Sequence, residues 1–264
     1  MKRVLLLAVF VGAGCHNPQT EMQLGNRAYF SGQPGQALGH YQVALQSPET
    51  RAAAGYNLGR LYLGQGEPGQ AIKSFELAQG PDLNLLRSQS FRMLGEFDQA
   101  RASLGDAVTP AEALERARIE LGASSSLSPE EILGLLEVAR QDPALSEAAT
   151  MEIVRLREAS GQVEEAVVEL ERLSATHPQR LDTDSRLGAN LLKLKRFAEA
   201  ESRFRRSLQR DPSDLPAYVG LGRALEGAGR VEEAVQVYQA LVSRLPPENE
   251  VVQDAGQRLE ALQR

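Results

Sequence analysis

The sequence predicts an all-α protein built as a solenoid of stacked helical hairpins. The first of three observations is a 34-residue spacing between small and apolar residues, which recurs toward both ends of the chain. The second is a composition with only 5% aromatic residues and no Trp, which favours helices over strands. The third is the placement of Gly and Pro between the apolar segments, where helices end and begin.

The first residues of the chain have the layout of an export signal. Two basic residues, Lys2 and Arg3, precede an apolar run over 4–11, and small residues then lead to Cys15, the only Cys of the sequence. The run is too short to cross a bilayer, which takes roughly 20 apolar residues. A single Cys also excludes a disulfide framework and a thiolate zinc site.

This segment resembles the lipobox of bacterial lipoproteins, with Gly12 at a position where that family usually has Leu. The resemblance implies removal of residues 1–14, diacylation of the Cys15 sulfur, and a short tether over 15–17. His16 stands where an Asp would favour retention in the inner membrane, so the expected location is the periplasmic side of the outer membrane. The alternative is ordinary signal-peptide cleavage that leaves Cys15 unmodified.

Two helical hairpins are expected next, over 18–51 and 52–80. Six of their positions match at the 34-residue spacing: Leu24, Gly25, Gly32, Ala37, Tyr41 and Ala44 recur as Leu58, Gly59, Gly66, Ala71, Phe75 and Ala78. We expect the Gly residues that follow Leu to meet the Ala residues where the two helices of a hairpin cross. We expect the aromatic residues to contact the next hairpin.

The middle of the chain is less regular, with a hairpin over 81–109 and a degenerate one over 110–146. Thr109-Pro110 and Ser128-Pro129 are each followed by Glu at the third helical position, which is the pattern of a capping box. They predict helices over 110–121 and 129–141.

The C-terminal half returns to the regular pattern in hairpins over 147–180, 181–214 and 215–248. The matching positions are Leu187, Gly188, Ala200, Phe204 and Pro212, which recur as Leu221, Gly222, Ala234, Tyr238 and Pro246. The Pro residues stop the second helix of each hairpin. A closing helix over 249–264 has a polar exposed side, which the end of a solenoid requires.

These repeated positions resemble the tetratricopeptide repeat family, whose units combine aromatic residues, Leu-Gly, Ala and a final Pro. The clearest unit begins at Tyr218, with Leu225 replacing an aromatic residue of the family pattern. The resemblance implies a right-handed superhelix in which the first helix of each hairpin lines a concave groove. It is a strong indication of fold and a weak one of function.

The sequence carries no recognisable catalytic or metal-binding motif. Its three His residues are scattered, and no His or Cys lies at the spacing of metal ligands. It also has no Gly-rich phosphate loop and no nucleophile motif, so we expect no catalytic residues, no metal and no cofactor. The net charge of −6 argues against nucleic acid as a partner.

The remaining function is binding of a protein in the groove. Carrying the helical phase along the chain places one set of side chains there in the first half and another in the second. The first set is Asn26, Tyr29, Tyr56, Asn57, Arg60, Leu63, Gln89 and Arg92, and the second is Arg155, Ser185, Ala189, Leu192, Val219 and Arg223.

Some members of the family grip a C-terminal carboxylate with five Lys, Asn and Arg side chains. Asn26, Asn57 and Arg87 match that set here, whereas Met22 and Asp82 stand where Lys is required. The four arginines of the expected groove are candidate anchors for an acidic or extended segment, because Arg is frequent at interfaces. The alternative is that these arginines are only solvated.

We therefore expect a lipid-anchored scaffold, not an enzyme, that contacts the membrane through its anchor alone. Its partner would be another envelope protein, such as a secretin or a subunit of an assembly machine. The overall plan is similar to that of pilotin-type lipoproteins of type IV pilus systems, which help a secretin to reach and oligomerise in the outer membrane. Two alternatives remain: an adaptor that tethers cell-wall hydrolases or proteases, and an accessory subunit of an exopolysaccharide or secretion machine.

Lipidation at Cys15 is directly testable. The variant Cys15→Ser should lose its acyl chains and with them its membrane anchorage, because the thiolate sulfur is the site of diacylation. Metabolic labelling with a palmitate analogue measures this, and label retained by the variant would contradict the lipobox interpretation.

Overall fold

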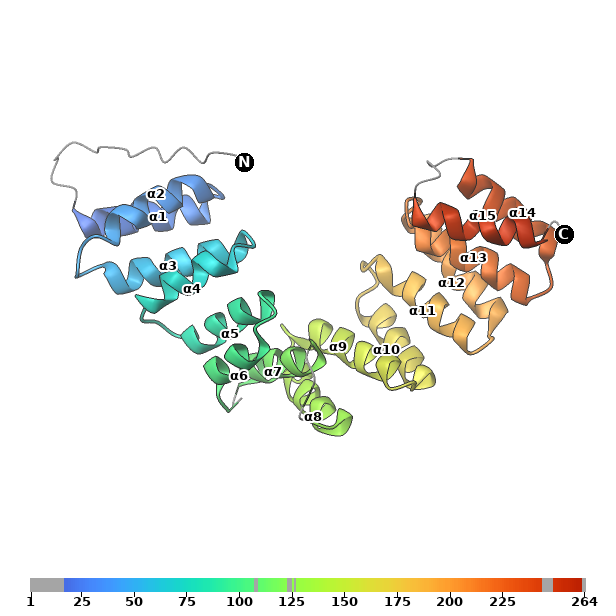
Figure 1. Ribbon diagram of the computed structural model, residues 1–264, viewed down its shortest axis with the longest axis horizontal. Helices are drawn as coiled ribbons and strands as arrows, with labels where there is room; N and C mark the ends of the chain where they lie inside the picture. The colour runs from blue at the N-terminus through green and yellow to red at the C-terminus, as the bar shows by residue number, and fades with distance from the viewer. Residues whose placement is uncertain (1–16, 107–108, 123–124, 126, 244–248, 263–264) are drawn as a thin grey trace. The chain divides into compact units, whose positions relative to one another are not determined.

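The computed structural model describes residues 17–106, 109–122, 125, 127–243 and 249–262. Within these ranges the chain forms fifteen α-helices and no strand, so the prediction of an all-α fold of repeated helical hairpins is confirmed. Consecutive helices pair as hairpins (Figure 1). The chain divides into two compact units, Met1–Ala107 and Val108–Arg264, which are taken separately below.

The first unit contains three helical hairpins. Their helices are α1 (Pro18–Phe30) and α2 (Pro34–Ala44), α3 (Arg51–Gly64) and α4 (Pro68–Glu76), and α5 (Leu83–Met93) and α6 (Phe97–Leu104). Each hairpin packs on the next through its neighbouring helices, α2 on α3 and α4 on α5. The core is formed by alanines, by leucines such as Leu58 and Leu61, and by two rings, Tyr41 and Phe75, which are at most 2% exposed.

The second unit contains four hairpins and a single last helix. Its helices are α7 (Pro110–Gly122), α8 (Pro129–Arg140), α9 (Ser146–Ala159), α10 (Val163–Thr176), α11 (Asp182–Lys193), α12 (Phe197–Arg210), α13 (Leu215–Gly227), α14 (Val231–Val242) and α15 (Glu250–Leu262). The largest core cluster runs through α9 to α15 and includes the buried rings of Phe204 and Tyr238. No helix of the described residues is both long and apolar enough to span a membrane.

Both capping boxes of the irregular hairpin form as the sequence predicts. The Ser128 hydroxyl accepts a hydrogen bond from the Glu131 N–H at 3.3 Å, and the Glu131 carboxylate accepts one from the Ser128 N–H at 2.7 Å. Thr109 and Glu112 make the same reciprocal pair at 3.2 Å and 2.9 Å. The hydrogen bond from the Ser128 N–H also lowers the pKa of Glu131, since it stabilises the ionised form.

The turns inside the hairpins require left-handed backbone. Five of the hairpins place Gly there, with φ between 68° and 77°, at Gly32, Gly66, Gly95, Gly161 and Gly229. The α11–α12 turn uses Lys195 instead, at φ 58°. A residue with a side chain pays more strain in this region than Gly does.

The glycines of the Leu-Gly positions pack on aromatic rings. A Cβ added to Gly25 would lie 2.6 Å from the Tyr41 ring, and one added to Gly222 would lie 2.3 Å from the Tyr238 ring. The atoms closest to these glycines therefore belong to the aromatic residue of the same hairpin, and not to the Ala residue that the sequence suggested. The same relation joins Gly59 to Phe75 and Gly188 to Phe204.

The expected contact of an aromatic residue with the next hairpin is also seen for one ring. A Cβ added to Gly220 of α13 would lie 2.2 Å from the Phe204 ring. Phe204 of α12 therefore packs between Gly188 of its own hairpin and Gly220 of the following one.

The ring-on-glycine contact predicts a sharp difference between two Gly→Ala variants of the second unit. Gly222→Ala should lower stability by about 1–3 kcal/mol, because its methyl group would overlap the buried Tyr238 ring. Gly134→Ala should raise stability by about 0.5–1 kcal/mol, because Gly134 is within α8 with open space around its Cα. Thermal unfolding measures both, and equal melting temperatures would contradict this packing.

Candidate functional site

The two Asn residues predicted to face the groove of the first unit hold its helices together. The Asn26 Oδ1 accepts hydrogen bonds from the Tyr41 hydroxyl at 2.8 Å and from the Asn57 Nδ2 at 2.9 Å. These bonds join α1 to α2 and α3. Arg87, the third residue that matches the carboxylate-gripping set, donates from Nη2 to the Phe75 carbonyl at 2.5 Å. All three side chains therefore have structural partners.

The other predicted residues of the first unit lie on α1, α3 and α5. The guanidinium carbon of Arg60 lies 5.8 Å from the centre of the Tyr56 ring, a cation–π contact within α3. Tyr29 is 37% exposed and meets Phe30 edge to face. Gln89 and Arg92 are half-buried on α5, and Cys15 lies outside the described residues.

The second unit contains a groove of about 770 Å³ that is lined by residues of α11, α12, α13 and α15. Five of the six residues predicted for this half line it: Ser185, Ala189 and Leu192 of α11, and Val219 and Arg223 of α13. Arg155 does not, since it lies on α9, is 62% exposed and pairs with Glu152 at 3.2 Å. A second hollow of about 660 Å³ shares Ser185, Ala189, Pro216 and Val251 with the groove and extends it toward the N-terminal ends of α11 and α13.

Apolar side chains form most of the wall of the groove. Phe204 and Val219 are buried beneath it, and Leu192, Phe197 and Val251 are half-buried around it. Sequence analysis missed both Phe residues, because they are on α12, a second helix, which the family pattern places away from the groove. Phe204 reaches the groove because it packs between the glycines of two neighbouring hairpins.

The last helix, expected to be a polar cap, supplies one wall. Glu250, Val251, Asp254 and Arg258 of α15 all line the groove. The buried residues of α15, Val252 and Ala255, fix which side of the helix faces outward. The signal available in the sequence was the helical spacing of Val252, Ala255 and Leu259, which predicts one apolar face on this helix.

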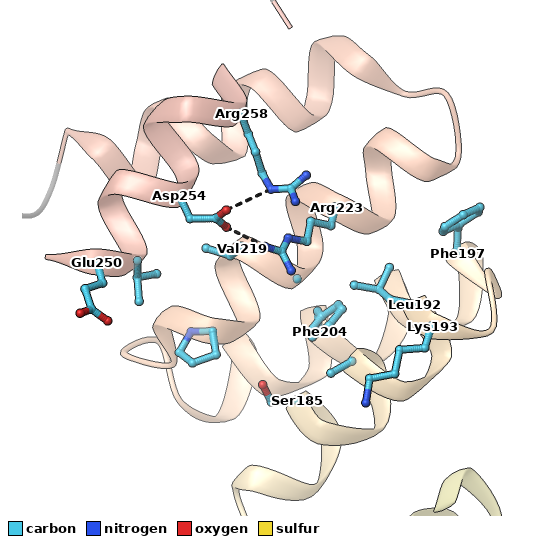
Figure 2. A pocket seen from close by; sticks show the side chains of 14 residues that line it. Ser185, Leu192, Lys193, Phe197, Phe204, Val219, Arg223, Glu250, Asp254 and Arg258 are labelled. Atoms are coloured by element: carbon cyan, nitrogen blue, oxygen red, sulfur yellow. Dashed lines mark hydrogen bonds and ion pairs between the residues drawn. The ribbon is translucent and has the colours of Figure 1, made fainter. Parts of the chain in front are cut away.

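Charged side chains tie this wall to the helices beside it. Figure 2 shows Asp254 between two arginines, with Arg223 Nη2 at 2.9 Å and Arg258 Nε at 3.5 Å. Arg258 also pairs with Glu226 of α13 at 3.3 Å, and Glu226 accepts a hydrogen bond from the buried Tyr238 hydroxyl of α14. Burial, together with this bond to a carboxylate, raises the pKa of Tyr238 far above its ordinary value.

Two charged residues of the groove lie apart from this network. Lys193 of α11 and Glu250 of α15 are exposed and make no ion pair with any described residue. Figure 2 shows them on opposite sides of the groove, with Val219 and Phe204 between them. The groove thus has apolar walls, a positive edge and a negative edge, which is the chemistry of a binding surface.

Several solved structures resemble this one in fold. A tetratricopeptide repeat protein from Parabacteroides merdae superposes with a TM-score of 0.63 at 14% identity, over 94% of this chain and 99% of that chain. PilW, a widely conserved type IV pilus biogenesis factor, superposes with a TM-score of 0.53 at 16% identity, over 90% and 97%. No curated protein matches the sequence.

The repeats are also recognised from the sequence in both units. A model of the tetratricopeptide repeat family matches residues 22–84, which cover α1 to α4, and residues 185–250, which begin in α11 and run beyond α14. The second match contains most of the residues that line the groove. From its helical hairpins, its repeated positions and these matches, the chain carries tetratricopeptide repeats in both of its units.

Proposed function

We propose that this protein is a scaffold that holds an extended segment of another protein in the groove formed by α11, α12, α13 and α15. Tetratricopeptide repeats are suited to protein–protein interaction, and their proteins are typically scaffolds rather than enzymes. The observation that carries the proposal is an elongated apolar hollow whose nearby ionic groups are mostly paired with one another. Such a surface binds a ligand mainly by burying the apolar side chains of that ligand.

The groove also specifies what the segment should look like. Apolar side chains fit between Leu192, Phe197 and Val251, which are only half-buried and would otherwise contact water. An acidic group on the side of Lys193 and a basic group on the side of Glu250 would complement the two unpaired edges. An apolar stretch with opposite charges at its ends satisfies both conditions.

For the cellular role, we propose a lipoprotein of the bacterial envelope that is anchored through Cys15 on the periplasmic side of the outer membrane. The lipobox-like sequence before Cys15 supports the anchor. The partner would then be an envelope protein under assembly, and the specific candidate is the secretin of a type IV pilus system. The likeness to PilW extends over 90% of this chain and is consistent with that candidate.

The test compares two variants that place the same charge at different apolar sites of the second unit. Leu192→Glu puts a carboxylate inside the groove, where it would lose water on binding, and should lower partner capture about tenfold or more. Val168→Glu, at a residue of α10 that is 63% exposed and outside the groove, should leave capture unchanged. Tagged chains are crosslinked in their own cells, purified and compared by quantitative mass spectrometry.

Two outcomes would count against the proposal. If Leu192→Glu and Val168→Glu capture the same proteins in equal amounts, the groove is not the binding site. If Leu192→Glu loses the proteins that the unchanged chain captures, but these are not envelope proteins, the groove remains the binding site and the proposed cellular role is wrong. A melting temperature for each variant excludes unfolding as the cause.

A further inference from the structure

Three arginines of α12 converge on one carboxylate outside the groove. Arg203, Arg206 and Arg210 follow one another at helical spacing and all reach Asp184 of α11, a set called here the Asp184 cluster. Arg206 follows Phe204 by two positions, which turns it to the side of α12 away from the groove. None of the four residues lines the groove.

The geometry of the cluster is crowded around a buried group. Asp184 is completely buried. Arg206 Nε and Arg210 Nη1 both approach its Oδ2 at 3.2 Å, while Arg203 Nη1 lies 3.6 Å from its Oδ1, which accepts no hydrogen bond. A buried carboxylate needs a compensating cation, and one well-placed arginine supplies it. Three exceed what Asp184 requires.

The cluster therefore carries an excess of positive charge. Two further acidic groups lie near the cluster: Glu171 of α10, with its Oε1 4.0 Å from Arg203 Nη2, and Glu199 of α12, which pairs with Arg196 and also interacts with the charge of Arg203. With Arg196 included, four guanidinium groups face three carboxylates, in a chain whose net charge is −6. Such a local excess is the electrostatic condition for holding an anion.

The donors of the three arginines are not used equally. Arg210 spends a second nitrogen on the Pro178 carbonyl at 2.6 Å, and Arg203 bridges toward Glu171. Arg206 approaches Asp184 with its Nε at 3.2 Å, and its side chain is 47% exposed. No hydrogen bond joins its two terminal nitrogens to another described residue, so their donors are available to a ligand.

We propose that the Asp184 cluster binds a phosphate group through Arg206, with Arg203 and Arg210 contributing charge. Arginine forks fit both carboxylates and phosphates, but a tetrahedral phosphate has enough oxygens to contact guanidinium groups that approach from several directions. The phosphate is supplied either free in solution or by an anionic lipid headgroup. This site is independent of the groove and does not rest on the function proposed for it.

The test measures binding of inorganic phosphate to the full chain by isothermal titration at constant ionic strength, with acetate as the carboxylate probe. Arg206→Gln should weaken phosphate binding about tenfold, the loss of one charge-assisted contact. Arg205→Gln is the matched control, because Arg205 directly precedes Arg206 on α12 and is similarly exposed, at 49%. Its guanidinium group pairs with Glu201 at 2.5 Å, outside the cluster. This variant should bind phosphate like the unchanged chain.

A second arm identifies the source of the phosphate. Vesicles of phosphatidylglycerol and of phosphatidylcholine are sedimented with the unchanged chain and with both variants. Retention on phosphatidylglycerol that Arg206→Gln loses and Arg205→Gln keeps assigns the site to a lipid headgroup. Binding of inorganic phosphate without such retention assigns it to free phosphate.

Three results would overturn the proposal. The first is equal phosphate binding by Arg206→Gln and Arg205→Gln. The second is binding of acetate or of a hexaglutamate peptide as tight as that of phosphate. The third is a failure of the unchanged chain to bind in both the titration and the sedimentation experiment. Should Arg206→Gln fail to fold, Arg206→Lys takes its place, because it keeps the charge and loses the fork. It should then bind phosphate more weakly than the unchanged chain.

Discussion

The packing of an aromatic ring against a glycine in four of the hairpins is the contact on which much of this structure depends. The ring comes from the second helix and the glycine from the first, so the two helices approach as closely as the thickness of the ring allows. The rings of Tyr41, Phe75, Phe204 and Tyr238 are at most 2% exposed. Because a buried ring removes a large apolar area from water, this contact supplies stability and fixes the spacing of the helices together.

The same contact shapes the groove of the second unit. Phe204 packs between Gly188 and Gly220, which brings α11 and α13 to either side of it. Its ring thereby becomes part of the groove as well as of the core. The network of Arg223, Asp254, Arg258 and Glu226 then sets α15 as the remaining wall. The groove is thus a direct product of repeat packing, with no separate loop or insertion to build it.

Sequence periodicity predicted the helices and the repeated positions because it reports which residues face inward. It did not predict which inward residues touch, and so it paired Gly with Ala where the structure pairs Gly with the aromatic ring. Helical phase also located Ser185, Ala189, Leu192, Val219 and Arg223, since residues of one helix face keep their direction from hairpin to hairpin. It did not place α15 at the groove, because the repeat is incomplete there, and Arg155 of α9 is not among the residues that line this groove. Asn26 forms hydrogen bonds with both Tyr41 and Asn57. These bonds depend on the distances between helices, and the spacing of residues in the sequence does not predict those distances.

Among the described residues, the helices of each unit make their main contacts with helices one or two places away along the chain. Contacts of this kind close short loops, whose entropic cost is low and which form quickly. A hairpin can therefore reach its final packing as soon as its neighbour is complete, without waiting for distant segments to arrive. Folding can therefore begin at any hairpin and spread to the hairpins beside it, in either direction along the chain.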